Sequence, residues 1–435
     1  MKLKSLLFAM VLSGLGGGVT QAQLSVKLGV MNDRSGVYAD IGGEASVVAA
    51  RMAVEDFKAA EKGIKVEIIS ADHQNKPDIG SNIARQWYDQ DGVDVILDVP
   101  TSSVALAISQ ITRDKNKVFI NSGAATSDLT GSQCSPNTVH WTYDTVQLAN
   151  VTGSAIVKTG GNTWFFLTAD YAFGHALERD TAAVVVKNGG KVLGSVRTPF
   201  PATDFSSFLL QAQSSGAKVI GLANAGGDTV TSIKQASEFG ITQGGQKLAG
   251  LLVFLQDVKA LDLKTAQGLL LSETFYWDLN DQTREWSKRF AERFGGKMPN
   301  MTNAGVYAGV LHYLKAVEAL KTKDAQKVMA KMKETPTDDP LFGKGLIRVD
   351  GRKIHDAYLF EVKKPEEAKG EWDLYKLVAT VPGDQAFRPL EEGGCPLVKK
   401  GRDRHGLRAR QPPLVYLRGA ARGMIGLRRS PAARR

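Results

Sequence analysis

The sequence predicts an α/β fold with two doubly wound lobes, each built on a parallel β-sheet. Short apolar segments alternate with segments that have the periodicity of amphipathic helices, a pattern typical of parallel strands joined by helical crossovers. The alternation runs twice, in two series of about 120 residues each, with a polar loop at 122–137 between them. The nearly continuous apolar run at 93–99 indicates a parallel strand that is buried on both faces.

The first series contains a helix whose apolar side chains return at helical spacing. Ala45, Val48, Met52 and Phe57 fall on one face of this helix. Pro77 starts the next helix, because proline fits the first helical turn. The predicted elements of this series are strands at 26–30, 66–69, 93–99 and 118–121 and helices at 45–57, 77–87 and 103–114.

The second series repeats this order, and the pattern then changes. Its predicted strands are 164–167, 192–196, 219–223 and 251–254, and its predicted helices are 147–158, 176–187, 205–213 and 229–239. A strand at 269–271 and helices at 282–294, 304–321 and 325–333 follow. Alternating apolar residues predict antiparallel strands at 346–349, 358–362 and 374–378, with a turn at Asp350-Gly351 between the first two.

The N-terminus has the composition of a secretory signal. Lys2 and Lys4 precede an apolar run at 6–15 and a stretch of small residues at 16–22. The apolar run is about half of what a bilayer core requires, so a membrane anchor is not expected. Removal of residues 1–22 and export of the chain are therefore predicted, and two cysteines in an exported protein, Cys134 and Cys395, are expected to form a disulfide.

The positive charge of the chain is concentrated at its C-terminus. The whole sequence has a formal net charge of +10, and residues 401–435 hold ten Arg and one Asp, which leaves +1 for residues 1–400. This distribution excludes a basic surface for nucleic acid over the body of the protein. The segment 401–435 contains Pro412-Pro413 and no apolar periodicity, so it is predicted to be a disordered tail that the fold does not need.

The sequence has none of the motifs that would predict an enzyme. The glycine pairs at 160–161, 189–190 and 226–227 do not form a dinucleotide fingerprint, and a phosphate loop and a Gly-x-Ser-x-Gly turn are both missing from the sequence. The histidines have no metal-site spacing. The sequence therefore predicts no catalysis, no metal site and no cofactor.

Hydroxyl side chains follow the buried strand at 93–99, where ligands bind in open α/β sheets. Thr101, Ser102 and Ser103 open a helix, and free backbone N–H groups together with hydroxyls form a site for a carboxylate. Alternatively, Ser102 or Ser103 serves only as a helix cap.

An ordered set of short motifs resembles the leucine/isoleucine/valine-binding protein family, the type I periplasmic solute-binding components of ABC importers. The resemblance extends from residue 26 to about residue 381. The motifs are Leu28-Gly29-Val30, Ser35-Gly36, Gly42-Gly43-Glu44, Pro100-Thr101-Ser102-Ser103, Asn121-Ser122-Gly123-Ala124-Ala125-Thr126 and Asp170-Tyr171-Ala172-Phe173-Gly174.

This resemblance implies a type I periplasmic binding protein fold with two lobes joined by three crossovers. The first lobe would combine 24–145 with 276–345, and the second 146–275 with 346–400. A small hydrophobic amino acid or a related carboxylate would bind in the cleft between the lobes, which close around it. The implied setting is the periplasm, with an ABC permease at the inner membrane as the partner, no nucleic acid, and a monomeric protein.

The resemblance also implies which residues hold the ligand. The carbonyl of Ala124 and the hydroxyl of Thr126 would hold its ammonium and carboxylate, and Tyr171 and Phe173 would close over it from the second lobe. Each of these could instead be a turn or core residue. Tyr38 and Asn224 are further candidates, because they stand near strand ends.

One departure from the family pattern concerns the ligand's ammonium. Family members usually carry an acid just after the strand matching 251–254, and here Phe254, Leu255 and Gln256 stand there unless Asp257 reaches the cleft. A buried ammonium without a counter-charge is unfavourable. A binding protein for an aromatic or aliphatic carboxylate therefore remains an alternative to an amino-acid binding protein. A ligand-sensing receptor domain is a further alternative, because such receptors use the same fold.

Overall fold

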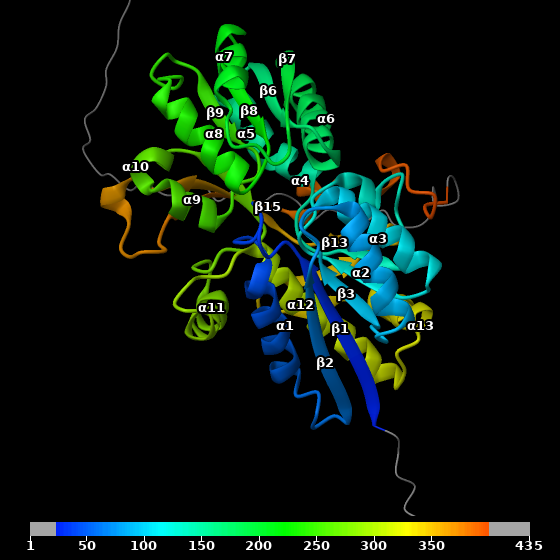
Figure 1. The fold of residues 1–435 in the computed structure, drawn as a ribbon. Coiled ribbons are helices and arrows are strands. Elements are labelled where there is room, and N and C mark those ends of the chain that lie inside the picture. Colours follow the sequence, from blue (N-terminus) through cyan, green and yellow to red (C-terminus); the bar gives the residue numbers. More distant parts are fainter. Residues whose placement is uncertain (1–22, 400–435) are drawn as a thin grey trace, which may run out of the picture. The chain divides into compact units, whose positions relative to one another are not determined.

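The computed structural model of the protein describes residues 23–399 (Figure 1). The predicted secretory signal at 1–22 and the predicted tail at 401–435 lie outside these residues. Within 23–399, every helix is either too short or too polar to cross a bilayer.

The first sheet has five parallel strands in the order β2-β1-β3-β4-β5. Four of its strands match predicted ones, and the short β5 falls just after the predicted polar loop, where the sequence analysis expects no strand. The strands are β1 (Leu24–Asn32), β2 (Ile64–Asp72), β3 (Val95–Asp98), β4 (Val118–Asn121) and β5 (Thr138–His140).

Helices cover both faces of this sheet, as its doubly wound topology requires. Helices α2 (Pro77–Asp89) and α3 (Ser102–Asp114) share one buried cluster with one face of the strands. Helices α1 (Gly43–Phe57) and α12 (Met301–Leu320) contact each other on the other face. Because α12 is enclosed on most sides, its apolar residues extend around the helix rather than along one stripe. The remaining helices are α11 (Asp281–Arg293), α13 (Ala325–Glu334) and the short η1 (Ser127–Thr130).

The second sheet has four parallel strands in the order β7-β6-β8-β9. Its strands are β6 (Thr163–Ala169), β7 (Lys191–Thr198), β8 (Val219–Ala223) and β9 (Lys247–Gly250). The helices are α6 (Ala172–Lys187), α7 (Ser206–Ser214), α8 (Gly227–Glu238), α9 (Leu255–Leu261) and α10 (Leu263–Ala266). The helix predicted at 147–158 is α4 (Thr145–Leu148), the π-helical η2 (Ala149–Gly153) and α5 (Ser154–Lys158) in succession. The predicted fold class, two doubly wound parallel-sheet lobes, is confirmed.

The strand predicted at 251–254 is wrong. Strand β9 ends at Gly250, and Leu251, Leu252, Val253 and Phe254 form a buried loop that leads into α9. A short apolar run reports burial but does not distinguish a strand from a buried loop. The true strand has exposed Lys247 at its start, since it lies at the edge of the sheet.

Two small antiparallel sheets complete the fold. One joins β10 (Leu270–Glu273), β14 (Ala357–Val362) and β15 (Tyr375–Val381). The other joins β11 (Thr337–Asp339), β12 (Gly343–Ile347) and β13 (Lys353–Ile354), so the turn at Asp350-Gly351 connects β12 to β13 and not to the next long strand. Short helices follow at η3 (Pro365–Glu367), α14 (Gly383–Ala386) and η4 (Leu390–Glu392).

The expected lobe boundary between residues 345 and 346 falls inside β12. Strand β12 pairs with β11 and β13, and Arg352 forms a β-bridge with His140 of the first sheet. We therefore propose that the first lobe extends to residue 354, with the third crossover immediately after it.

A disulfide joins Cys134 to Cys395, with 5.6 Å between their Cα atoms. Cys134 follows η1, and the segment that carries Cys395 packs on the same loop, where the Arg388 guanidinium donates a hydrogen bond to the Ser127 carbonyl oxygen at 3.0 Å. The bond connects residues that are 261 positions apart, so it constrains most of the described chain.

Replacing both cysteines by serine should lower the free energy of unfolding by about 2–5 kcal/mol, because the cross-link restricts the unfolded chain. Urea unfolding of the variant and of the reduced protein measures this effect, and the two should agree. Unreduced, denatured protein should have no reactive thiols, so detection of two of them would contradict the pairing.

Candidate functional site

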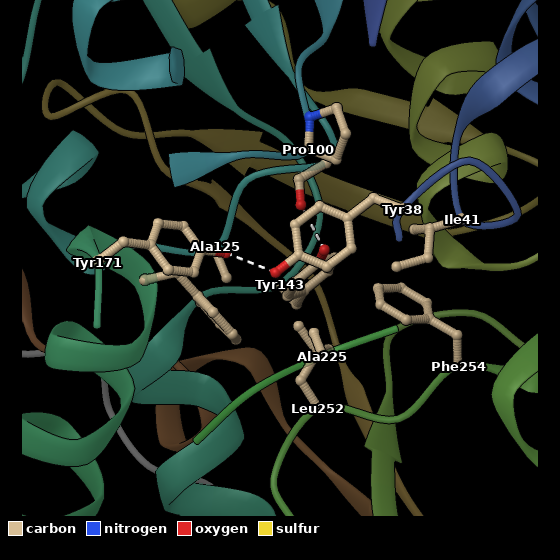
Figure 2. A pocket seen from close by; sticks show the side chains of 11 residues that line it. Tyr38, Ile41, Pro100, Ala125, Tyr143, Tyr171, Ala225, Leu252 and Phe254 are labelled. Carbon is tan, nitrogen blue, oxygen red and sulfur yellow. Dashed lines mark hydrogen bonds between the residues drawn. The ribbon is translucent and has the colours of Figure 1, made fainter. Parts of the chain in front are cut away.

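A narrow cavity lies where the carboxyl ends of the two parallel sheets face each other (Figure 2). Loops after β1, β3, β4 and β5 line it from the first lobe, and loops after β6, β8 and β9 line it from the second. Only about 10 Å³ within it admits a water-sized sphere, so the side chains nearly fill the space. The lining residues are Tyr38, Ile41, Pro100, Gly123, Ala125, Tyr143, Tyr171, Phe173, Ala225, Leu252 and Phe254.

Local hydrogen bonds fix the loop between β1 and α1 that carries Tyr38. The Asp33 carboxylate accepts hydrogen bonds from the backbone N–H groups of Gly36 at 2.8 Å and Tyr38 at 2.9 Å. Further along, the Ile41 carbonyl oxygen accepts from the side-chain amides of Asn300 and Asn303 on α12 and its cap. These bonds place Tyr38 and Ile41 against the cavity.

Five of the eleven residues that line the cavity are aromatic. Tyr171 stacks on Phe200 with 4.1 Å between ring centroids, and Tyr38 lies 5.4 Å from the same phenylalanine. On the other side, Tyr143 meets Phe254 edge to face at 5.8 Å. Such arrangements satisfy the ring quadrupoles and leave ring faces for an apolar ligand.

The two lobes contact each other directly beside the cavity. The hydroxyls of Tyr38 and Tyr171 lie 2.6 Å apart, and Figure 2 shows them meeting between the lobes. The backbone N–H of Gly227 donates a hydrogen bond to the Val37 carbonyl oxygen at 3.1 Å. These contacts hold the lobes in a closed arrangement.

Tyrosine is the only ionisable residue type among the residues that line the cavity in the described part of the chain. Burial above all, and then the neighbouring Tyr171 and Asp228, raise the pKa of Tyr38. Asp228, in the first turn of α8, is 1% exposed, and burial raises its pKa to about 7. One of its carboxylate oxygens accepts from the Ala202 N–H at 3.3 Å, and the other has no hydrogen-bond partner among the described residues.

Comparison with known proteins agrees with this architecture. The model of the family described as periplasmic binding protein matches residues 25–370. The chain belongs to the periplasmic binding protein family. A periplasmic binding protein from Burkholderia mallei is 54% identical, with a TM-score of 0.84, and the match covers 86% of this chain and 99% of that one.

Two further relatives carry more specific descriptions. A branched-chain amino acid ABC transporter periplasmic ligand-binding protein from Burkholderia xenovorans LB400 is 41% identical, with a TM-score of 0.76 and coverage of 86% and 99%. The Leu/Ile/Val-binding protein homolog 6 from Brucella melitensis is 25% identical over 378 residues, covering 84% of this chain and 94% of the relative. The predicted resemblance to the leucine/isoleucine/valine-binding protein family is confirmed, and the family consists of solute-binding proteins rather than enzymes.

Three of the residues predicted from the sequence line the cavity of this periplasmic binding protein: Tyr38, Tyr171 and Phe173. The segment that carries the last two is held against the end of β6 by Gly174, where a Cβ atom would lie only 2.0 Å from the Ala169 carbonyl oxygen. A glycine is required there so that α6 can begin close to the strand.

The hydroxyl residues after β3 and β4 lie beside the cavity but do not line it. The Thr101 hydroxyl donates to the Asn75 side chain, and the Ser102 hydroxyl accepts from the Thr126 N–H at 3.2 Å. The Thr126 hydroxyl accepts from the Asp128 N–H at 3.3 Å and so caps η1. Ser103 is half-buried at the start of α3 and makes no side-chain hydrogen bond within the described residues.

The remaining candidates, Ala124 and Asn224, are occupied by internal contacts. The Ala124 carbonyl oxygen accepts from the Asn121 side-chain amide at 2.8 Å. Asn224 bonds to the hydroxyls of Ser232 at 2.9 Å and Thr229 at 2.7 Å, within its own helix entry. Neither lines the cavity.

The acidic side chain considered for the ligand ammonium, Asp257, does not line the cavity. Its carboxylate accepts the Phe254 N–H at 2.9 Å and caps α9. The Gln256 side-chain amide donates a hydrogen bond to the Met298 carbonyl oxygen at 2.9 Å. Of the residues 254–257, Phe254 is the one that lines the cavity.

The sequence analysis missed eight lining residues: Ile41, Pro100, Gly123, Ala125, Tyr143, Ala225, Leu252 and Phe254. Most of these residues are sequence neighbours of predicted ones. The correct loops were therefore predicted, but not which residues of each loop face the cavity. Tyr143 follows the missed strand β5, and Leu252 and Phe254 lie in the segment wrongly predicted as a strand. No group of acidic, histidine or cysteine side chains in residues 23–399 has the geometry of a metal site.

Gly226→Ala should hold the lobes apart. Gly226 has φ +58°, and an added Cβ atom would lie 2.5 Å from the Val37 carbonyl oxygen across the interface. Small-angle X-ray scattering should therefore give a larger radius of gyration than for the wild type. Gly240→Ala is the matched control, since Gly240 has φ +65° just after the other end of the same helix and an added Cβ atom would lie 3.8 Å from the Gln243 side chain.

Both glycine variants should lose about 1–3 kcal/mol of stability from backbone strain, because both residues have positive φ values that favour glycine. Only Gly226→Ala should change the scattering. Equal radii for the wild type and both variants would contradict the role of this contact in closure.

Proposed function

We propose that this protein captures a small hydrophobic amino acid or a related carboxylate for an ABC importer by closing its two lobes around the ligand. The observation that carries the proposal is the cavity between the carboxyl ends of two parallel sheets, lined from both lobes and bounded by the Tyr38–Tyr171 contact. Ligands of open α/β sheets bind at this position. The 41% identical Burkholderia xenovorans relative, described as a branched-chain amino acid transporter component, supports the same ligand class.

The cavity wall suits the apolar body of such a ligand. Ile41, Leu252 and Phe254 offer hydrocarbon surface, and Tyr171 and Phe173 add ring faces from the second lobe. Because the closed cavity is so small, a ligand can enter only when the lobes separate. Closure then buries the ligand's apolar surface, which contributes about 25 cal/mol per Å².

The start of α3 suits the ligand's carboxylate. Backbone N–H groups of the first helical turn have no intrahelical partners and attract anions. Pro100, just before this helix, lines the cavity, and the Ser103 hydroxyl in the first turn has no partner within the described residues. Ser102 and Thr126, which bond to each other, would act by fixing the two loops rather than by direct contact.

The carboxyl of Asp228 is the group that favours an amino acid. It lies three residues after Ala225 of the cavity wall, and its negative charge acts on both Tyr38 and Tyr171. An ammonium brought near it would favour the ionised form and lower its raised pKa. Asp228 would thus supply the counter-charge for the ligand's ammonium. Family members usually carry this acid in the segment after β9, where this chain has Phe254.

A second candidate function, binding of an aromatic carboxylate, is favoured by the composition of the wall. Five aromatic residues line the cavity: Tyr38, Tyr143, Tyr171, Phe173 and Phe254. No acidic residue is among the lining residues of the described chain, so an acid without an ammonium would bring no buried cation that lacks a counter-charge.

The remaining assignments follow from the family. We propose that residues 1–22 direct export and are removed, that the mature protein is a periplasmic monomer, and that it delivers its ligand to an ABC permease at the inner membrane. Closure of the lobes around the ligand would change the surfaces of both lobes together. A permease could distinguish the ligand-bound form by this change.

Calorimetric titration with leucine, 4-methylpentanoate and benzoate should separate the two candidates. For an amino-acid binding protein, leucine binds best, and Asp228→Asn weakens leucine about tenfold or more while leaving 4-methylpentanoate unchanged. Leucine affinity should also rise from about pH 6 to about pH 8, because the Asp228 carboxyl must ionise to pair with the ammonium. Benzoate affinity should not show this rise.

Tighter binding of benzoate or 4-methylpentanoate than of leucine would favour the second candidate. Binding of uncharged sugars or of cations alone would contradict both candidates. Thermal unfolding of Asp228→Asn, run alongside, verifies that the variant is folded.

Ser103→Ala should weaken carboxylate binding by about tenfold, because a hydrogen bond to a charged group is lost. Thermal stability should stay near that of the wild type, since the hydroxyl has no partner within the described residues. Ser207→Ala is the control, as Ser207 is the second residue of α7, just as Ser103 is the second residue of α3. Unchanged affinity in Ser103→Ala would place the carboxylate elsewhere.

A further inference from the structure

A fully buried carboxyl, Asp98, lies at the end of β3 directly beneath the cavity wall. It is the last residue of the strand, two positions before the lining residue Pro100. Burial raises its pKa to about 6, although hydrogen bonds from Asn32, Ser46 and Ser122 act in the opposite direction. Among the described residues, the hydrogen-bond partners of this carboxyl are neutral side chains, so its burial calls for a structural reason.

Its contacts reach the end of β1 and the loop after β4, the two strands that flank β3 in the sheet. One carboxylate oxygen accepts from the Asn32 side-chain amide at 2.9 Å, and the same amide group donates to the Gly43 carbonyl oxygen at 2.8 Å. The other oxygen accepts from the Ser122 hydroxyl at 3.4 Å. The Asp98 carbonyl oxygen accepts from the backbone N–H groups of Ser122 at 3.4 Å and Gly123 at 3.3 Å.

Glycines allow these loops to close on the carboxyl. A Cβ atom on Gly42 would lie 2.7 Å from one carboxylate oxygen of Asp98, and a Cβ atom on Gly123 would lie 2.8 Å from the other. The carboxyl is therefore enclosed between the loop that precedes α1 and the loop that follows β4. A longer acid would not fit this space.

The backbone around Asp98 is held in an unfavourable conformation. Asp98 has φ +78° and Val99 has φ +59°, two consecutive residues other than glycine in the left-handed region. Such strain persists where the surrounding contacts over-determine it, and it is concentrated at functional sites. Here the left-handed pair turns the chain from β3 into the cavity wall at Pro100.

We propose that Asp98 is a positioning residue of the ligand site, which fixes three of the four cavity-lining loops of the first lobe relative to one another. These loops carry Tyr38 and Ile41, Pro100, and Gly123 and Ala125. The proposal rests on the proposed function in that the cavity is taken as the ligand site. Asp98 itself does not line the cavity and acts through its neighbours.

The test compares Asp98→Ala and Asp98→Asn with a control on the same strand. An asparagine can keep both bonds, because its oxygen can accept from Asn32 and its amide can donate to the Ser122 hydroxyl. Asp94 is also a buried aspartate, 5% exposed, but it precedes β3 at the opposite end and pairs with Lys323 at 3.1 Å. Asp94→Ala therefore reports a loss of buried charge pairing away from the site.

Hydrogen exchange without ligand is the first measurement. Asp98→Ala should exchange about tenfold faster at both 36–43 and 121–126, because the shared anchor of these loops is lost. Asp98→Asn should stay close to wild type, and Asp94→Ala should leave both segments unchanged. Wild-type exchange in Asp98→Ala, or the same acceleration in Asp94→Ala, would overturn the proposal.

Titration with leucine and benzoate is the second measurement. Whichever binds the wild type should bind Asp98→Ala at least tenfold more weakly and Asp98→Asn nearly as well. Undiminished affinity in Asp98→Ala would overturn the proposal. If neither compound binds the wild type, the proposed ligand class fails, while the exchange data still decide the role of Asp98.

Should Asp98→Ala not fold, Ser122→Ala replaces it, since this change removes a single partner of the carboxyl. Faster exchange confined to 121–126 would support the proposal. Unchanged exchange in that segment would overturn it.

Discussion

The close backbone approach between the two lobes is the contact on which the candidate site depends. Gly226 and Gly227 bring the start of α8 against Val37, at a distance that no side chain on Gly226 would permit. This approach places the hydroxyls of Tyr38 and Tyr171 within hydrogen-bonding distance. The cavity exists only because these two surfaces meet, since each lobe alone would leave its share of the aromatic residues facing water. The glycines at the interface thus determine how closely the aromatic residues of the two lobes can approach each other.

Buried polar groups connect the segment after β5 to the segment around β13. Arg352 donates hydrogen bonds to the carbonyl oxygens of Thr142 and Tyr143, and it pairs with Asp144 at 3.3 Å. His355 contacts the Trp141 carbonyl oxygen at 3.0 Å. Because Tyr143 lines the cavity, this network connects the segment 352–355 to the cavity wall.

The wall of the cavity combines apolar contact with directional polar groups placed just outside it. Aromatic rings and aliphatic side chains supply contact area without a fixed charge. The start of α3 and the Asp228 carboxyl lie on opposite lobes. A ligand with a carboxylate and an ammonium at one end would therefore contact both lobes at once. Under the proposed function, this arrangement would make closure depend on the ligand's chemistry, since a ligand that contacts only one lobe would gain less from closure.

The sequence by itself determined the fold class, because hydrophobic periodicity reports which face of each element is buried. Their place after buried strands of one parallel sheet pointed to the loops after β3 and β4, while the family resemblance pointed to the loop after β6 in the other sheet. The sequence could not decide which residue of each loop faces the cavity: Ser102 and Thr126 turn to each other, while Pro100, Gly123 and Ala125 face inward. The strand prediction at 251–254 was wrong, because the burial of these residues comes from packing between elements distant in sequence. These outcomes depend on long-range contacts, which only the tertiary structure decides.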